Sequence, residues 1–208
     1  MKKTFYFLFL GIFCFQGIAG DLDIYRRMKG TDVERQLLNL ARQTIKQCLN
    51  GEKKQMPAFS LDGQWPGGQV GVFVTLVKDN TVRACVGNFY PQECGFLDAI
   101  IKVATQSTYL DARFKPISPE ELNKIRIIIS VTGTWIPVSN PHSIDFKNYG
   151  LLIKQGDKTA VLLPGEAKTT NWGLKMIAKK AGITSNSEIE YYQFETITFE
   201  EAQDENTR

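Results

Sequence analysis

Histidine is almost absent from this chain, and its scarcity removes several kinds of active site. The 208 residues include one histidine, His142, in a turn-like Asn-Pro-His-Ser segment where we expect a solvated side chain. Without a second histidine or a Cys-x-x-Cys pair, the sequence has no ligand set typical of a zinc site. It also lacks a phosphate-binding loop, a dinucleotide fingerprint and a Gly-x-Ser-x-Gly nucleophile elbow. We therefore predict neither a metal nor an organic cofactor.

The chain also has no large excess of charge of either sign. Its 25 lysine and arginine residues and 22 acidic residues give a formal net charge of +3. Nothing resembles the basic stripe of a nucleic-acid-binding protein, so we predict no nucleic-acid partner.

The N-terminus is the exception to this mixed composition. Met1-Lys2-Lys3 precedes an apolar run over 5–15, and the small residues Gly17 and Ala19 follow. This order is typical of a secretory signal peptide, and the run is shorter than the about 20 residues of a membrane span. We therefore predict a signal peptide over residues 1–20 and one exported domain over 21–208, periplasmic or secreted. Only an uncleaved signal anchor would attach the chain to a membrane.

Three cysteines remain after residues 1–20, which is an odd number. An oxidising compartment permits one disulfide and one thiol, or three thiols. Cys48 lies on the apolar face of a predicted helix, so we expect it in the core. Cys85 and Cys94 are close enough in sequence to pair, and the sequence leaves their geometry open.

A β-hairpin is predicted over 70–86, because β-branched runs flank the polar Lys78-Asp79-Asn80. Side chains alternate along a strand, so Arg83 and Cys85 share one face of its second arm and Val82, Ala84 and Val86 share the other. A neighbouring cation favours the thiolate and lowers the pKa of a cysteine. The alternative is structural: Cys85 packs as a small apolar residue, and Arg83 is a surface or ion-pair residue.

Other elements follow from periodicity and end signals. Helices are predicted over 31–51 (with Thr31 and Glu34 as a capping box), after Gly95, from Ser118 and over 170–182; strands are predicted over 125–131, 149–155, 159–163 and 191–199. Trp172 and Met176 lie four residues apart in the last helix, and we expect them in its core face. Strands joined by tight turns and interspersed with helices predict an α+β fold with antiparallel sheets.

An irregular segment over 111–116 carries the other candidate site residues. Asp111 and Arg113, with the aromatic Phe114, suit the binding of an anionic or polar substrate. An alternative of equal weight is structural: Asp111 and Arg113 would form an ion pair that stabilises the loop, and Phe114 would fill the core. Glu166, after Leu-Leu-Pro-Gly, is either close to a site or a surface carboxylate.

Three segments together resemble the AMMECR-one domain family, the A component of AmmeMemoRadiSam systems. Residues 71–76, Gly-Val-Phe-Val-Thr-Leu, are similar to its Gly-x-Phe-Val-Thr-Leu strand, and 82–87 stand where the family has Leu-Arg-Gly-Cys-Ile-Gly. Residues 111–116 are similar to its Asp-Pro-Arg-Phe-x-Pro elbow. Leu-Leu-Pro at 162–164 and Lys-Ala-Gly at 180–182 match two further landmarks, so that the resemblance extends from about Arg35 to Phe199.

The resemblance implies two α+β subdomains with antiparallel sheets flanked by helices, and a cleft between them lined by the Arg83–Cys85 strand. It implies a Memo-type metal protein and a radical SAM enzyme as partners. Export would separate this chain from a cytosolic radical SAM enzyme, so we retain only the Memo-type partner. Ala84 replaces the family glycine, and its methyl group would limit how closely a ligand approaches the backbone at this position.

Our leading hypothesis from the sequence is an exported enzyme in a modification pathway, with Cys85 as nucleophile or transient acyl carrier. Arg83 would poise the thiolate, and the substrate would be held by side chains of Asp111, Arg113 and Phe114 and by the backbone of Gly87 and Asn88. The alternative is a non-catalytic ligand- or protein-binding module that uses Arg83 and Arg113 in the same cleft. In a third hypothesis, a Cys85–Cys94 disulfide is purely structural.

Overall fold

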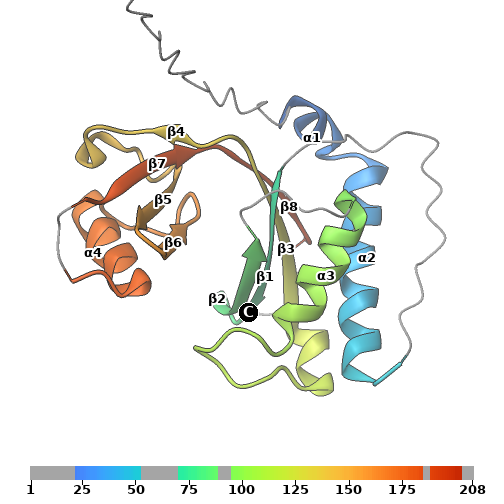
Figure 1. Cartoon of the computed structure of the whole chain (residues 1–208). Helices are drawn as coiled ribbons and strands as arrows, with labels where there is room; N and C mark the ends of the chain where they lie inside the picture. The colour runs from blue at the N-terminus through green and yellow to red at the C-terminus, as the bar shows by residue number, and fades with distance from the viewer. Residues whose placement is uncertain (1–21, 53–69, 89–94, 185–187, 203–208) are drawn as a thin grey trace, which may run out of the picture.

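Two four-stranded antiparallel sheets divide the molecule into two lobes (Figure 1). The structure is a computed structural model that describes residues 22–52, 70–88, 95–184 and 188–202. The predicted signal peptide and Cys94 lie outside these residues. The arrangement confirms the predicted α+β class. Across the described ranges, no helix is both long and apolar enough to span a membrane.

The first lobe contains a sheet of order β2-β1-β3-β8, with helices packed on one face (Figure 1). Its elements are α1 (Leu22–Met28), α2 (Asp32–Leu49), β1 (Gly71–Lys78), β2 (Thr81–Asn88), α3 (Phe96–Ser107), the 3₁₀ helix η1 (Pro119–Lys124), β3 (Ile125–Thr132) and β8 (Thr196–Glu200). The alternate side chains of β3 predicted to share a face are all at most 4% exposed: Ile125, Ile127, Ile129 and Val131. They form the core with α2 and α3.

Local signals placed two elements of this lobe correctly. Asp79 and Asn80 have φ of 50° and 56°, the left-handed pair that a tight two-residue hairpin turn requires. The Thr31 side chain accepts a hydrogen bond from the Val33 amide and so caps α2 as predicted. Its capping-box partner differs, because the Glu34 carboxylate accepts from the amides of Gly30 and Glu200.

The second lobe contains a sheet of order β4-β7-β5-β6 and one α-helix. Its elements are β4 (Ile136–Pro137), the 3₁₀ helix η2 (Pro141–Ser143), β5 (Gly150–Gln155), β6 (Lys158–Leu162), α4 (Thr170–Ala181) and β7 (Glu190–Phe194). Helix α4 is capped by the Thr169 side chain, one residue before the predicted Thr170, and ends at Gly182 with φ of 67°.

The prediction that Trp172 and Met176 form the core face of α4 is wrong. They are 41% and 38% exposed, and the helix packs through Gly173 and Ile177 instead. A Cβ on Gly173 would lie 2.8 Å from the Ala167 side chain, so the missing side chain permits the close approach of α4. The helix has apolar residues on more than one side, and periodicity alone did not identify the buried one.

The predicted strand over 191–199 is two strands in different sheets, separated by Glu195. Phe194 and Phe199 are both fully buried, one in each lobe. They are five positions apart, an odd number, so in a continuous strand they would point to opposite faces. The break lets Phe199 enter the core of the first lobe, while Phe194 packs in a cluster between the lobes with Leu163 of the second lobe and Phe73 of the first. The lobes are also connected by the segment between β3 and β4, which runs beside the break at Glu195. There the Gly133 amide donates a hydrogen bond to the Glu195 carbonyl.

Candidate functional site

A bulge in β2 sets the direction of Arg83. Leu76 pairs with Ala84 and Val77 with Val82, so Arg83 is an extra residue opposite β1. Bulges redirect side chains and interrupt alternation. The predicted common face of Val82 and Ala84 is therefore wrong: Val82 is 41% exposed and Ala84 is 2% exposed, packed in the first core.

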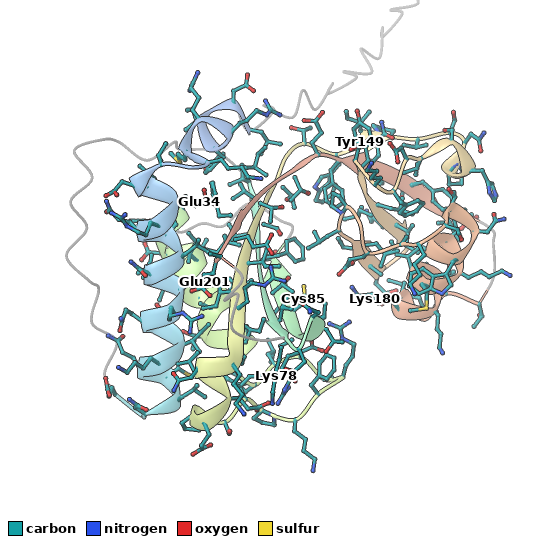
Figure 2. The ribbon with its side chains drawn as sticks, turned by 180° about the vertical axis from the view of Figure 1, so that it is seen from behind. Glu34, Lys78, Cys85, Tyr149, Lys180 and Glu201 are labelled. Carbon is teal, nitrogen blue, oxygen red and sulfur yellow. The ribbon has the colours of Figure 1, made fainter. Side chains whose placement is uncertain are left out.

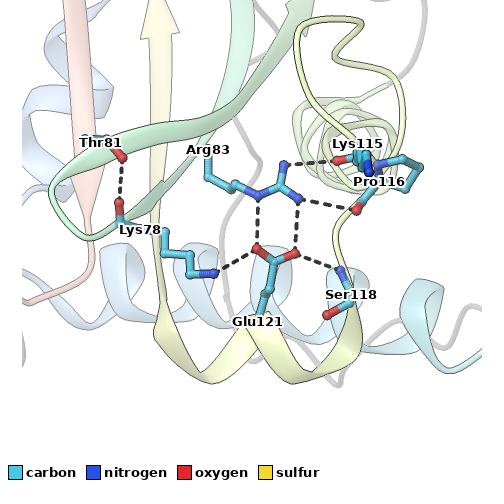
Figure 3. Close-up of polar contacts among 7 residues, drawn as sticks. All are labelled: Lys78, Thr81, Arg83, Lys115, Pro116, Ser118 and Glu121. Atoms are coloured by element: carbon cyan, nitrogen blue, oxygen red, sulfur yellow. Dashed lines mark hydrogen bonds and ion pairs between the residues drawn. The ribbon is translucent and has the colours of Figure 1, made fainter.

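We call residues 111–116 the elbow. The Arg83 side chain links β2 to η1 and to the elbow through hydrogen bonds and an ion pair (Figure 3). Its guanidinium makes a two-pronged pair with Glu121 at 3.0 and 3.1 Å. It also donates to the carbonyls of Lys115 at 3.0 Å and Pro116 at 3.3 Å. Arg83 and then Lys78 lower the pKa of Glu121 to about 2. The Arg83 charge is thus engaged by Glu121 and the elbow.

The Cys85 thiol is protonated at neutral pH. Burial raises the pKa of this thiol, and this effect outweighs the hydrogen bond from the Thr75 hydroxyl, 3.1 Å from Sγ, which lowers it. The charges of Lys180 and Arg113 also lower the pKa, whereas Glu166 raises it. The shift is opposite in direction to the one predicted from Arg83. Cys85 is a free cysteine, and its predicted alternative partner Cys94 lies outside the described residues.

Asp111 ties the elbow to the edge of β2. Its side chain is 7% exposed, and its Oδ2 accepts from the Cys85 amide at 2.8 Å and from Arg113 Nη2 at 2.7 Å. Its Oδ1 accepts from the Arg113 amide and from Nε, at 3.1 and 2.9 Å. Burial alone would raise the pKa of Asp111, but these four bonds and the Arg113 charge lower it to about 2.

Arg113 is held by Asp111 with one edge of its guanidinium open. The pairing with Asp111 raises the pKa of Arg113, and the side chain remains 52% exposed. Nε and Nη2 bind Asp111, while Nη1 has no partner among the residues that the structure describes. Phe114 lies between two cations, 5.3 Å from Arg113 and 5.8 Å from Arg83. The ion-pair alternative is correct for Asp111 and Arg113, whereas Phe114 is 37% exposed and does not fill the core.

The second lobe adds two charges to the surroundings of Cys85. The Lys180 ammonium donates to the Val161 carbonyl at 2.7 Å, and the Glu166 carboxylate accepts from the Leu163 amide at 2.9 Å. Both act electrostatically on the Cys85 thiol. Figure 2 shows Cys85 and Lys180 on the facing sides of the two lobes. We call Cys85, Asp111, Arg113, Glu166 and Lys180 the inter-lobe site.

The sequence did not identify Lys180 as a site residue. Its only signal was its place in the Lys-Ala-Gly landmark at the end of α4. The structure thus brings together three of the predicted residues and adds Glu166, previously ambiguous, and Lys180. His142 lies apart in η2 and is exposed. The described parts of the chain contain no group of three His, Cys, Asp or Glu side chains arranged to hold a metal ion.

Strand β2 contains three further residues singled out in the sequence: Ala84, Gly87 and Asn88. A Cβ on Gly87 would lie 2.2 Å from the Phe73 ring, so glycine is required for packing. Asn88 is the last residue of β2. The Ala84 methyl packs in the first core, on the opposite side of β2 from the Cys85 thiol, so the replacement of the family glycine does not cover the thiol.

Comparison with known proteins agrees with this architecture. A family model described as AMMECR1 matches residues 38–201. A protein of Methanosarcina barkeri is 35% identical over 150 residues, covering 68% of this chain and 73% of that protein. One from Methanothermobacter thermautotrophicus is 31% identical over 187 residues, covering 82% and 95%. The crystal structure of the protein PH0010 from Pyrococcus horikoshii has a TM-score of 0.67 at 28% identity and covers 79% of this chain and 89% of its own. Fold, motifs and relatives agree, and the chain belongs to the AMMECR1 family.

Proposed function

We propose that the inter-lobe site binds a small anionic or polar ligand, with Arg113 as its main anchor. The observation that carries this proposal is the Arg113 guanidinium, which Asp111 holds through Nε and Nη2 while Nη1 stays open. A fixed guanidinium with free N–H groups is well suited to carboxylate or phosphate. This is the binding alternative of the sequence analysis, with Arg113 and not Arg83 as the contact residue.

Two neighbours support an anionic ligand. Lys180 supplies a second positive charge close to Cys85, and Cys85 itself is neutral because burial raises its pKa. The Asp111 charge is already compensated by four hydrogen-bond donors. A ligand at Arg113 Nη1 therefore meets two cations, with Glu166 as the remaining acidic side chain.

Titration calorimetry of the mature chain with acetate and with inorganic phosphate tests the proposal. Arg113→Gln should weaken the binding of the preferred anion at least about tenfold, the cost of one charge-assisted contact. Arg27→Gln is the matched control, because Arg27 is exposed on α1. Equal affinity of wild type and Arg113→Gln for both anions would refute the proposal.

The second candidate function is an enzyme that uses Cys85 as a nucleophile, and three contacts of Cys85 favour it. The Thr75 hydroxyl donates to Sγ, and Lys180 and Arg113 both lower the pKa of the thiol. Alkylation of each cysteine with iodoacetamide across pH, resolved by peptide mass spectrometry, separates the two candidates. Cys48, which contacts Thr108, is the internal reference. An apparent pKa of Cys85 well below about 8.5 would favour the nucleophile, and a higher value would favour a neutral thiol in a binding site.

Export and partnership are proposals that stand on the sequence and on family membership. We expect residues 1–20 to be absent from the mature protein, and the measured N-terminus of protein recovered outside the cytoplasm tests this. A Memo-type protein remains the partner we propose. Copurification of that partner with the wild type but not with Arg113→Gln would tie the partnership to the inter-lobe site.

A further inference from the structure

We propose that the anionic group bound by Arg113 is the C-terminal carboxylate of an extended polypeptide, which adds to the outer edge of β2 as an antiparallel strand. This inference rests on the proposed function and names its ligand class. Strand β2 is the edge of the first sheet, so its outer backbone groups have no neighbouring strand among the described residues. Edge strands bind extended peptides through main-chain hydrogen bonds.

The backbone of β2 presents an open position at Gly87. The Cys85 amide points away from β1, because it donates to Asp111. Backbone groups of residues two apart in a strand point to the same side. The amide and carbonyl of Gly87 therefore also face outward, and Gly87 is exposed and has no side chain to obstruct an approaching backbone. This is a place where a main chain of a ligand can pair with β2.

The elbow closes the other end of this edge. Arg83 holds the Lys115 and Pro116 carbonyls against β2, and Asp111 occupies the outward amide of Cys85. A strand that pairs at Gly87 and continues past Cys85 would collide with the elbow. The bound segment must therefore end near Cys85, which favours a chain terminus over an internal segment.

The charges identify which terminus fits. Asp111 accepts four hydrogen bonds, so it has no free lone pair for an amine. Arg113 Nη2 and the Cys85 amide lie 2.7 and 2.8 Å from the same carboxylate oxygen, so the Arg113 guanidinium lies beside the outer edge of β2. Gly87 is two residues further along the strand, about 7 Å. A terminal carboxylate at Arg113 and the carbonyl two residues before it, at Gly87, match this spacing.

The direction of the bound chain follows. Its C-terminus lies at Cys85 and its body extends toward Gly87, opposite to the direction of β2. The neutral Cys85 thiol borders the terminal residue, and Lys180 of the second lobe adds the second cation. The bound terminus is thereby enclosed by charges from both lobes.

Nuclear magnetic resonance titration of the mature chain tests the inference with three probes: a randomised tetrapeptide pool with acetylated N-termini and free C-termini, the same pool amidated at the C-terminus, and acetate. We expect the free-acid pool to shift the Gly87 amide resonance and to bind at least about tenfold more tightly than the amidated pool. Arg113→Gln should abolish the preference for the free acid, while Arg27→Gln should retain it. Solvent exchange of the Gly87 amide should slow on binding.

The other outcomes separate this inference from the proposed function. If acetate and the free-acid pool bind with equal affinity through Arg113 and the Gly87 amide is unaffected, the anion site stands and the peptide inference is refuted. If the amidated pool, or an amidated peptide with an internal glutamate, binds as tightly as the free-acid pool, the terminal carboxylate is refuted. If no probe binds in an Arg113-dependent manner, both proposals fail.

Discussion

Replacing Asp111 by asparagine tests how the elbow is held. The carboxylate is nearly buried and accepts bonds from Cys85 and Arg113, which lower its pKa from 3.8 to about 2. An asparagine of the same shape has one acceptor oxygen and places its amide group against N–H donors. The variant should therefore lose a pH-dependent part of the free energy of unfolding and a pH-independent part.

The pH-dependent part follows from linkage. A carboxyl whose pKa is lower in the folded state contributes stability above its unfolded pKa, and the contribution disappears as pH falls through its folded pKa. Lowering the pKa of Asp111 from 3.8 to about 2, at about 1.4 kcal/mol for each pH unit, gives about 2.5 kcal/mol, which we reduce to about 2 kcal/mol because the partner Arg113 is half exposed. About half of it should be lost near pH 3, with little left at pH 2. The unpaired amide adds about 1–3 kcal/mol at every pH.

Urea unfolding of wild type and Asp111→Asn, followed by far-UV circular dichroism between pH 7 and pH 2.5, measures both parts. Glu121, whose pKa is also about 2, is present in both proteins, so its contribution cancels in the difference. The difference in the free energy of unfolding should be greatest above pH 5 and should shrink as the pH falls. A difference that stays constant over this range would refute the assignment of a buried, charged Asp111.

Three other changes have clear expected outcomes. Arg83→Ala should lower the free energy of unfolding by about 3 kcal/mol in urea titration, because Glu121 loses two of its four donors and the Lys115 and Pro116 carbonyls lose theirs; a change below about 0.5 kcal/mol would contradict this role of Arg83. Gly87→Ala should cost about 1–3 kcal/mol and lower the melting temperature, since the new methyl would lie 2.2 Å from the Phe73 ring; an unchanged melting temperature would contradict this packing. Trp172→Ala should cost less than about 1 kcal/mol, against 3–5 for a buried tryptophan, because Trp172 is 41% exposed; a cost in the buried range would restore the core assignment.

Short-range patterns in the sequence were sufficient for most elements. The hairpin turn at Asp79-Asn80, the cap at Thr31 and the buried alternation of β3 depend on residues within a few positions of one another. The ion pair of Asp111 and Arg113 is also local, since the partners are two positions apart. These features were therefore predictable from the sequence, as was the α+β class.

The predictions that failed depended on contacts between distant residues. The leading hypothesis placed Arg83 beside the Cys85 thiol, but the ion-pair alternative is correct, and the partner is Glu121, 38 residues later. The strand over 191–199 was expected to be continuous, but it divides between two sheets, and its two phenylalanines are buried in different clusters. Trp172 and Met176 satisfied helical spacing, but only the close approach of Gly173 to Ala167 and Phe146 reveals the buried side of α4.

The composition and local order of residues in this chain already specified most of its secondary structure, its family and the strand that carries Cys85. The surroundings of that thiol were decided by the tertiary structure, because burial and charge depend on which lobes meet. Burial outweighs the nearby cations and keeps the thiol neutral, and the second lobe brings Lys180, 95 positions from Cys85 in sequence, close enough to act on it. Arg113, rather than Arg83, has the open guanidinium edge because only the folded elbow determines which cation is already paired.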